Sequence, residues 1–386
     1  MEAGTLLFSF FLIFTGAALF STIALFLRQP LLVAYIFTGI VLGPFGFSLI
    51  SDPSLLADIS EFGIIFLLFL LGLDMQISKL MVTLRKTFTI TLVSTAVFFA
   101  IGLLTGLLFS YPPGESVIIG FTMIFSSTII GIKLLPTTVL HQKHMGELMV
   151  GILLLQDFIA ILLLAFLETN NVGESNTLRV LLALPVLLVV SYGLTRLVML
   201  WLIARWDHFK EYIFLLAIGW CLGISELAQA LGLSAEIGAF TAGVALATSP
   251  IALYIAQELK PLRDFFLVLF FFSLGAQFNI DALPAILLPA IMLATAALAC
   301  KPLVFYLLLR RFSERKRLAW DAGLRLGQIS EFSLLLAFVA VQSGAIGELT
   351  SLTIQAAAIL TFLVSSYLVV MYCPTPIASN PKLRRD

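Results

Sequence analysis

Long apolar stretches alternate with short polar connections along the whole chain. An apolar helix of about 20 residues crosses the hydrocarbon core of a bilayer, and by this measure the sequence predicts about thirteen membrane-spanning segments. Because the connections are short, we expect no inserted soluble domain and predict an all-α polytopic membrane protein. The expected spans are residues 4–27, 30–50, 58–78, 86–110, 116–135, 146–168, 177–205, 209–231, 234–249, 262–278, 282–309, 319–342 and 348–372.

Two of these spans carry polar residues and glycine at mid-depth, where a membrane helix is ordinarily apolar. Residues 116–135 contain Ser126, Ser127 and Thr128 at their centre, and residues 319–342 contain the stretch GQISE. Such interruptions are typical of discontinuous helices, which expose the polar ends of their backbone to a site at the membrane midplane. The alternative is that Ser and Thr bond to their own helix while Gly allows close packing.

The places of the two interrupted spans indicate an internal repeat. Residues 30–168 and 234–372 each contain about five spans, and the interrupted span is the fourth in both series. The first series starts from the inner side of the membrane and the second from the outer side. The sequence therefore predicts two inverted five-helix repeats, each with one discontinuous helix, an arrangement found in many secondary transporters.

Lysine and arginine are confined almost entirely to every second connection. One such connection carries a cluster of basic residues within 310–317, whereas the connections YPPGES and QFNIDALP carry none. Cytoplasmic loops of membrane proteins are enriched in these residues. We therefore expect the N-terminus outside and the C-terminus, with the polar tail 374–386, in the cytoplasm.

Composition excludes most other classes of protein. Hydrophobic residues make up 60% of the chain, charged residues 11%, and the mean hydropathy is +1.09, which is not the composition of a soluble domain. The formal net charge of +0 gives no reason to expect nucleic acid as a partner. Span 4–27 lacks a basic region before it and a cleavage site, so we expect a retained helix. We find no nucleophile motif and no metal-ligand spacing among the 3 Cys, and we expect neither an enzyme nor a cofactor.

Four ionisable residues lie well inside apolar spans, namely Asp157, Lys301, Arg325 and Glu331. A charge at that depth is costly and usually functional. Two acids and two bases can instead form a structural ion network, in which Arg325 and Glu331 neutralise each other across the break in their helix. Asp157 is the strongest functional candidate, because it lies in an otherwise apolar span beside Gln156.

The chemistry expected of Asp157 is competition between a proton and a metal cation. Burial favours the protonated acid, whereas a nearby cation favours the carboxylate, so the two ligands exclude one another at the same oxygen atoms. The amide oxygen of Gln156 and the oxygens of Ser126, Ser127 and Thr128 are candidates to complete a shell of hard ligands for K+ or Na+.

A series of motifs, taken together and in order, resembles the Kef-type branch of the monovalent cation:proton antiporter superfamily. The resemblance covers essentially the whole chain. The motifs are PLLVAYIFTGIVLGPFG (30–46), FLLFLLGLDM (66–75), FSSTIIGIKLL (125–135), LLQDFIAILLLA (154–165), LGLSAEIGAFTAGVALATS (231–249), FFFSLGAQFN (270–279) and LGQISEFSLLLA (326–337).

The resemblance implies a homodimer in which a core domain moves against a dimerisation domain in an elevator-like manner. Both domains would belong to one transmembrane region, residues 1–373. The core would contain residues 86–168 and 282–372, the dimerisation domain residues 4–78 and 209–278, and the linker helix residues 177–205. Within the core, the two discontinuous helices would cross at their breaks.

The resemblance also assigns roles to single residues. Asp157 matches the family's ion- and proton-carrying aspartate, and Lys301 and Glu331 match its core lysine and glutamate, with Arg325 as a further supporting charge. Electrogenic members carry a second acid where this chain has Gln156, so a single carboxylate implies electroneutral one-for-one exchange. The resemblance to the Kef-type branch implies that K+ is exchanged for H+ and that the protein lies in a bacterial inner membrane. Na+ is the alternative ion, and a ligand-gated K+ efflux channel is the alternative mechanism.

This chain departs from the Kef-type pattern at its C-terminal end. Kef-type proteins usually continue into a cytosolic nucleotide-binding regulatory domain, whereas residues 374–386 form a short polar tail or the start of a linker. The regulatory domain would then belong to a longer chain or to a separate subunit, or regulation would be absent.

Overall fold

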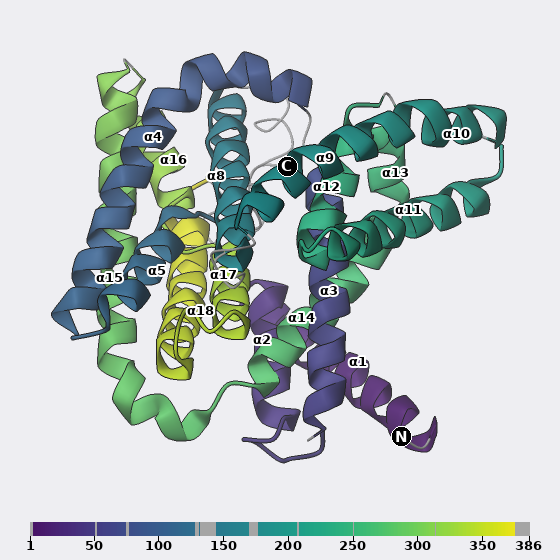
Figure 1. Cartoon of the computed structure of the whole chain (residues 1–386). Helices are drawn as coiled ribbons and strands as arrows, with labels where there is room; N and C mark the ends of the chain where they lie inside the picture. The colour runs from purple at the N-terminus through teal and green to yellow at the C-terminus, as the bar shows by residue number, and fades with distance from the viewer. Residues whose placement is uncertain are drawn as a thin grey trace. The chain divides into compact units, whose positions relative to one another are not determined.

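The computed structural model describes residues 3–50, 52–74, 77–127, 131, 144–169, 177–206, 208–249, 251–312 and 314–374. This part of the chain is helical throughout and contains no β-strand (Figure 1). It includes 6 helices that are long and apolar enough to cross a membrane, accompanied by shorter apolar helices. The predicted all-α polytopic fold is therefore confirmed, whereas the count of about thirteen spans stays a prediction.

The helices follow the apolar pattern of the sequence. In chain order they are α1 (Ala3–Phe26), α2 (Leu31–Leu42), α3 (Pro53–Asp74), α4 (Ile77–Leu108), α5 (Pro113–Ile124), α8 (His144–Thr169), α9 (Thr177–Leu194), the π-helix η1 (Thr195–Met199), α10 (Leu200–Trp206), α11 (Lys210–Ala230), α12 (Ala235–Ala247), α13 (Ala252–Glu258), α14 (Lys260–Ala276), the 3-10 helix η2 (Ile280–Ala282), α15 (Leu283–Arg311), α16 (Lys316–Arg325), α17 (Glu331–Gln342) and α18 (Glu348–Tyr372).

Two helices differ from the expected spans. The span expected over 30–50 is helical only over Leu31–Leu42, because Pro44 has no N–H group with which to continue the helix. In contrast, α4 begins at Ile77 rather than at residue 86, since the Leu, Met, Lys and Arg residues of the intervening stretch are good helix formers.

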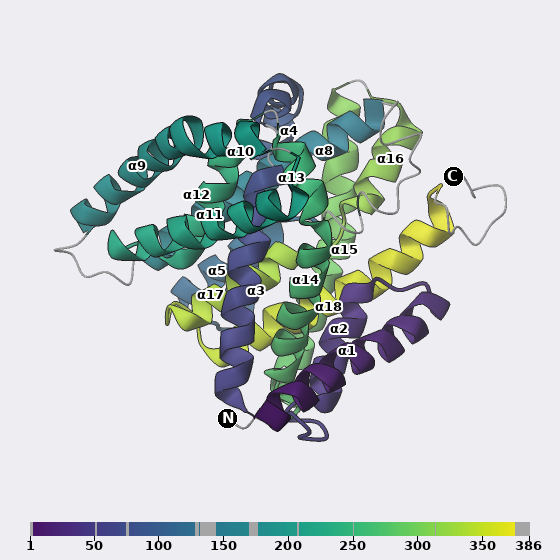
Figure 2. The same ribbon diagram turned by 90° about the vertical axis from the view of Figure 1, so that its right-hand side faces the viewer.

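The chain divides into two compact units, which we describe separately. The first unit contains α3 and α9–α14, and within it α3 and α14 are in contact and run side by side in Figure 2. The second unit contains α4, α5, most of α8 and α15–α18. The division into a core and a dimerisation domain stays a prediction. The first unit comprises Met1–Ala17, Thr38–Lys79 and Ala165–Gln277, and the second comprises Ala18–Phe37, Leu80–Leu164 and Phe278–Asp386.

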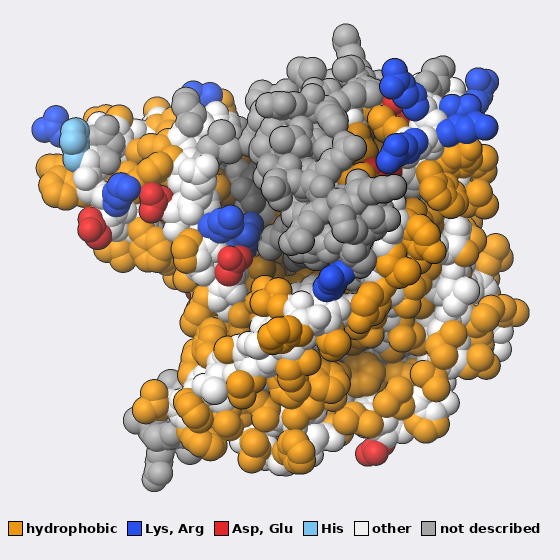
Figure 3. Space-filling model, turned by 180° about the vertical axis from the view of Figure 1, so that it is seen from behind, with side chains coloured by type: hydrophobic (Ala, Val, Ile, Leu, Met, Phe, Trp, Pro, Cys, Tyr) orange, Lys and Arg blue, Asp and Glu red, His pale blue; other side chains and the backbone are white. Residues whose placement is uncertain are grey.

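Hydrophobic side chains cover most of the described surface in Figure 3. Some of the largest are also the most exposed, with Phe26 at 85%, Leu197 at 78% and Leu7 at 74%. Contiguous apolar surface of this kind is unfavourable in water but is the normal exterior of a protein in hydrocarbon.

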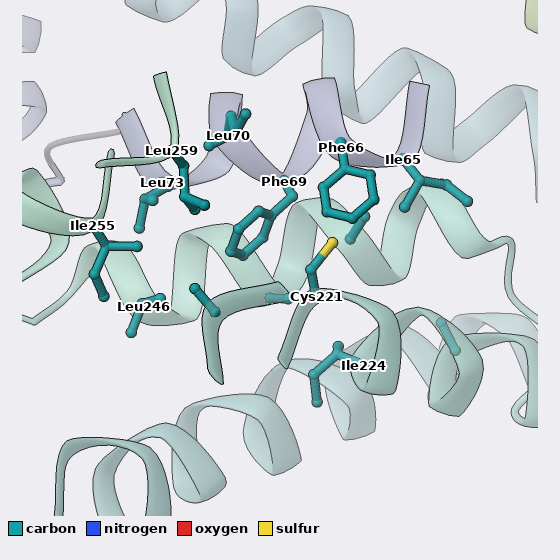
Figure 4. Close-up of a cluster of buried hydrophobic side chains, with 14 of the residues drawn as sticks. Ile65, Phe66, Phe69, Leu70, Leu73, Cys221, Ile224, Leu246, Ile255 and Leu259 are labelled. Atoms are coloured by element: carbon teal, nitrogen blue, oxygen red, sulfur yellow. The ribbon is translucent and has the colours of Figure 1, made fainter. Parts of the chain in front are cut away.

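In the first unit, α3 and α12 pack with their backbones in contact at two glycines. A Cβ atom on Gly72 would lie 2.6 Å from the carbonyl oxygen of Phe240, and one on Gly243 would lie 2.1 Å from that of Phe69. Only glycine permits so close an approach. Figure 4 shows Phe69 and Cys221 in the adjoining cluster of buried side chains, which α3, α11, α12 and α13 contribute.

In the second unit, α15 and α16 approach each other almost as closely. A Cβ atom on Gly323 would lie 2.7 Å from the carbonyl oxygen of Pro302. The last helix, α18, packs against α15, α16 and α17. Its first turn is also joined to α5, because the Thr350 hydroxyl donates a hydrogen bond to the Glu115 carboxylate.

The first predicted interruption is present after α5. This helix ends at Ile124, where Phe125 takes an extended conformation with φ −81° and ψ 142°. The chain stays non-helical through Ser127 and is helical at Gly131. The predicted ligand Thr128 lies outside the described residues, as does the tail 375–386.

The second predicted interruption separates α16 from α17. The helix α16 ends at Arg325, and α17 begins at Glu331. The intervening residues 326–330 are irregular. Ser330 caps α17, because its hydroxyl accepts a hydrogen bond of 3.1 Å from the backbone N–H of Phe332. Both interruptions are thus found where the polar, glycine-bearing stretches predicted them.

We expect Gly243→Ala to destabilise the first unit by roughly 1–3 kcal/mol, because the added methyl group forces two backbones apart. The matched control is Gly223→Ala on α11, where an added Cβ meets nothing within 4 Å. In the control, alanine should be neutral or mildly stabilising. Thermal unfolding of the purified proteins in one detergent measures both, and equal midpoints for the two variants would contradict the expected contact.

Candidate functional site

Asp157 and Gln156 lie next to each other on α8, inside the second unit. Asp157 is 3% exposed and Gln156 is fully buried. Within the described part of the chain, the Asp157 Oδ1 and the Gln156 Nε2 are buried without a hydrogen-bond partner. A polar atom in this condition costs about 1–3 kcal/mol, and more when the group is charged. The site therefore holds a donor and an acceptor that can still bind a ligand.

The interruption that follows α5 at residues 125–127, called the first break from here on, lies directly against Gln156. The backbone N–H of Ser126 donates to the Gln156 Oε1 at 3.1 Å, and the Ser126 hydroxyl donates to the carbonyl oxygen of Leu326 at 2.9 Å. Ser126 therefore joins α8 to the first break. It also joins the first break to the second break, which is formed by residues 326–330 between α16 and α17. The expected ligand role of the Gln156 oxygen is constrained by this contact, since one of its two lone pairs is already used.

Lys301 is fully buried on α15 and reaches both breaks. Its Nζ donates to the carbonyl oxygen of Phe125 at 2.7 Å and to that of Gln328 at 2.9 Å, and it lies 5.2 Å from the centroid of the Phe98 ring. The carbonyl ends of helices carry negative partial charge. The ammonium group thus lies where α5 and α16 terminate, and it holds the two breaks together.

Arg325 is also fully buried, at the end of α16. Its Nε forms a salt bridge of 2.9 Å with Asp321, one turn earlier, and its second guanidinium nitrogen donates to the carbonyl oxygen of Pro374 at 2.6 Å. This salt bridge lies within one half-helix, and the pairing of Arg325 with Glu331 across the second break stays a hypothesis. Sequence reasoning missed Asp321, although its i,i+4 spacing from Arg325 was a usable signal.

Glu331 is the first residue of α17 and is 8% exposed. An acid in the first turn is stabilised by the positive partial charge at the N-terminus of a helix. Its negative charge also acts on Asp157, so the two carboxyl groups belong to one electrostatic region. The sequence had presented Asp157 as an isolated acid, because the chain separation between these residues hides their proximity.

Hydroxyl groups of neighbouring helices complete the second break. The backbone N–H of Ile329 donates to the Thr361 hydroxyl of α18 at 3.2 Å, and the Ser333 hydroxyl donates to the carbonyl oxygen of Thr122 on α5 at 2.6 Å. Sequence reasoning overlooked both hydroxyl groups. The available signal for Thr361 was the series of Ser, Thr and Gln residues in the otherwise apolar span 348–372, and for Ser333 it was the position of this serine just after the GQISE stretch.

The groups near Asp157 are amide, hydroxyl and carbonyl oxygens, which suit hard cations. The structure brings Gln156 and Ser126 together directly, and both breaks meet beside them. Among the residues that the structure describes, no group of three or more His, Cys, Asp or Glu side chains could hold a metal ion.

Comparison with known proteins gives a consistent picture. A family model described as "Sodium/hydrogen exchanger, transmembrane" matches residues 11–373. K(+) efflux antiporter 5 of Arabidopsis thaliana is 30% identical over 324 residues, covering 80% of this chain and 56% of that protein. The glutathione-regulated potassium-efflux system protein KefC of Klebsiella pneumoniae is 31% identical over 340 residues, covering 84% of this chain and 54% of that protein. The chain thus spans little more than half the length of these relatives.

Two further likenesses extend the comparison. Iron transporter MagA of Paramagnetospirillum magneticum is 30% identical over 315 residues, covering 81% of this chain and 73% of that protein. The solved structure of the sodium proton antiporter MjNhaP1 from Methanocaldococcus jannaschii superimposes with a TM-score of 0.66 at 17% identity, covering 95% of this chain and 96% of that one. At this identity the structural likeness shows the shared fold.

We expect Lys301→Met to lower the stability of the second unit by roughly 1–3 kcal/mol, because two buried carbonyl groups lose their donor. Methionine avoids the cost of burying an ammonium group, which limits the loss. The control is Lys316→Met, an exposed lysine in the first turn of α16. Thermal unfolding in one detergent should show a lower midpoint for Lys301→Met alone, and indistinguishable midpoints would refute the role given to Lys301.

Proposed function

Because this chain belongs to the sodium/hydrogen exchanger family, we propose that it is a secondary transporter that exchanges a monovalent cation for protons at Asp157. The observation that carries this proposal is the burial of Asp157 together with the missing hydrogen-bond partner, among the residues described, of one of its oxygen atoms. Its carboxyl group is buried beside the first break, and one of its oxygen atoms has no hydrogen-bond partner in the described part of the chain.

The charges around Asp157 favour a mobile counter-ion. Lys301 donates to two backbone carbonyl groups, and Arg325 forms its salt bridge with Asp321. The nearby negative charge of Glu331 adds to that of Asp157. A buried acid in such a field is stable only when a proton or a cation neutralises it. Either ligand satisfies the same oxygen atom, so binding of one displaces the other.

We favour K+ as the exchanged cation and electroneutral one-for-one exchange. The names of the relatives from Arabidopsis thaliana and Klebsiella pneumoniae support K+, and the neutral Gln156 beside Asp157 supports a single transported charge. Na+/H+ exchange and a ligand-gated K+ efflux channel are the alternatives. Iron is disfavoured as cargo, because the described part of the chain offers Asp157 no cluster of His, Cys or acidic ligands.

The proposal includes the architecture in which exchange takes place. The chain would span a bacterial inner membrane with its N-terminus outside and its C-terminus in the cytoplasm, as about thirteen helices in two inverted repeats. A homodimer would hold the dimerisation domain fixed while the core carries Asp157 across the membrane in an elevator-like movement. A cytosolic nucleotide-binding domain or subunit would regulate it. The second unit, which holds Asp157, Lys301 and both breaks, is the candidate for the moving core.

The direct test is cation-driven proton movement in proteoliposomes, followed with a pH-sensitive dye. We expect Asp157→Asn and Asp157→Ala to lower the rate by at least about a hundredfold, because both variants remove the carboxyl group that takes up the proton. The exposed acid Asp281 supplies the control, and Asp281→Asn should keep the wild-type rate. Exchange that survives in Asp157→Ala would rule out this site, and cation flux without proton movement would favour the channel.

Stoichiometry and ion identity follow from the same vesicles. We expect K+ gradients to drive a larger dye response than Na+ gradients, and we expect the response to be the same with and without an imposed membrane potential. One-for-one exchange moves no net charge, so the potential contributes nothing to its driving force. A response that grows with the potential would contradict electroneutral exchange, and a larger response to Na+ would replace K+ as the favoured ion.

A further inference from the structure

Gln328 lies in the middle of the second break and is fully buried. Its backbone carbonyl accepts one of the two hydrogen bonds of Lys301, at 2.9 Å. Both ends of its side-chain carboxamide are also hydrogen-bonded. The Nε2 donates to the carbonyl oxygen of Arg325 at 2.9 Å and to that of Ser127 at 3.3 Å, and the Oε1 accepts from the Ser365 hydroxyl at 3.1 Å.

These contacts join three separate elements at one planar group. Ser127 belongs to the first break, Arg325 ends α16, and Ser365 lies on α18. Two of the partners are backbone carbonyl groups near the ends of interrupted helices, and that of Ser127 also accepts a hydrogen bond of 3.0 Å from the backbone N–H of Gly131. A carboxamide is the side chain that supplies two donors and an acceptor in one plane without carrying charge.

A short path leads from this carboxamide to Asp157. Gln328 holds the carbonyl group of Ser127, and the preceding residue, Ser126, donates its N–H to Gln156, which adjoins Asp157. We propose that Gln328 is a positioning residue of the cation site, which sets the orientation of the first break against Gln156 and Asp157. This inference rests on the proposed exchange function and adds a residue that touches neither cation nor proton.

Substitution by glutamate gives a specific expectation. In Gln328→Glu, the atom that faces the two carbonyl groups becomes an oxygen without a hydrogen whenever the acid is ionised. Only the protonated acid can donate there again, and then to one carbonyl group rather than two. Because burial favours the protonated acid, we expect Gln328→Glu to exchange best at acidic pH and to lose exchange as the pH rises, so that the alkaline limb of its pH profile shifts downward by about one pH unit or more relative to the wild type.

Gln328→Met tests the hydrogen bonds without adding an acid. We expect its half-saturating cation concentration to rise about tenfold, with a smaller change in maximal rate, because the ligands of the site are less well oriented. The matched controls are Gln355→Glu and Gln355→Met. Gln355 is buried on α18 and donates to Ser351 of the same helix, so its variants should keep the wild-type pH profile and half-saturating concentration.

If the Gln328 variants do not fold, two serine variants that each remove one hydrogen bond still test the positioning role of Gln328. Ser365→Ala removes only the donor to the Gln328 Oε1, whereas Ser366→Ala removes a bond to Phe362 within α18. We expect the half-saturating concentration to rise by about twofold to fivefold in Ser365→Ala and to stay unchanged in Ser366→Ala.

All measurements use proteoliposomes of the full chain with K+ and Na+ gradients, and thermal midpoints are recorded in parallel. Wild-type parameters in folded Gln328 variants, or equal effects at Gln328 and Gln355, would overturn the positioning role while leaving exchange intact. If the Gln328 variants fail to fold, equal values for Ser365→Ala and Ser366→Ala would overturn it. A wild-type protein without exchange would overturn the proposed function and this inference together.

Discussion

The structure depends on how backbone polar groups are satisfied where two helices are interrupted inside an apolar unit. An unbroken helix satisfies its own N–H and carbonyl groups, whereas a break exposes several of them at a depth where water cannot reach. Here side chains replace the missing partners, some from neighbouring helices and some from the breaks themselves. Lys301, Gln328, Ser126 and Thr361 each bond to backbone atoms of a break, so the two breaks, α15 and α18 are fixed relative to one another.

Apart from Asp157, the buried ionisable residues of the site lie at the ends of the interrupted helices or beside a fixed partner. Lys301 lies at the carbonyl ends of α5 and α16, Glu331 lies at the N-terminus of α17, and Arg325 is neutralised by Asp321. Each of these ionisable groups has a helix end or a fixed partner beside it. The Asp157 Oδ1 lacks a hydrogen-bond partner within the described part of the chain, and in this respect Asp157 differs from Lys301 and Arg325.

The sequence predicted those features that a local pattern determines. Apolar length predicted the helices, and polar, glycine-bearing stretches predicted both breaks, because one interruption within a single apolar span is visible without tertiary information. Partners that are distant in the chain could not be predicted in this way. Lys301 was left open between an ion network and a functional charge, and its bonds to carbonyl groups, one of them 176 residues away, could not be predicted. The proximity of Glu331 to Asp157 and the contacts of Gln328 likewise depend on the packing of separate helices.

The bond between Arg325 and the carbonyl group of Pro374 couples the point where the chain leaves α18 to the half-helix that precedes the second break. Moving Pro374 away would leave a buried guanidinium donor without its acceptor, at a cost of about 1–3 kcal/mol. The two positions are therefore thermodynamically linked. Any influence that stabilises one placement of the exit also stabilises the arrangement of α16 that accompanies it, and by reciprocity the arrangement of α16 acts on the exit with equal free energy.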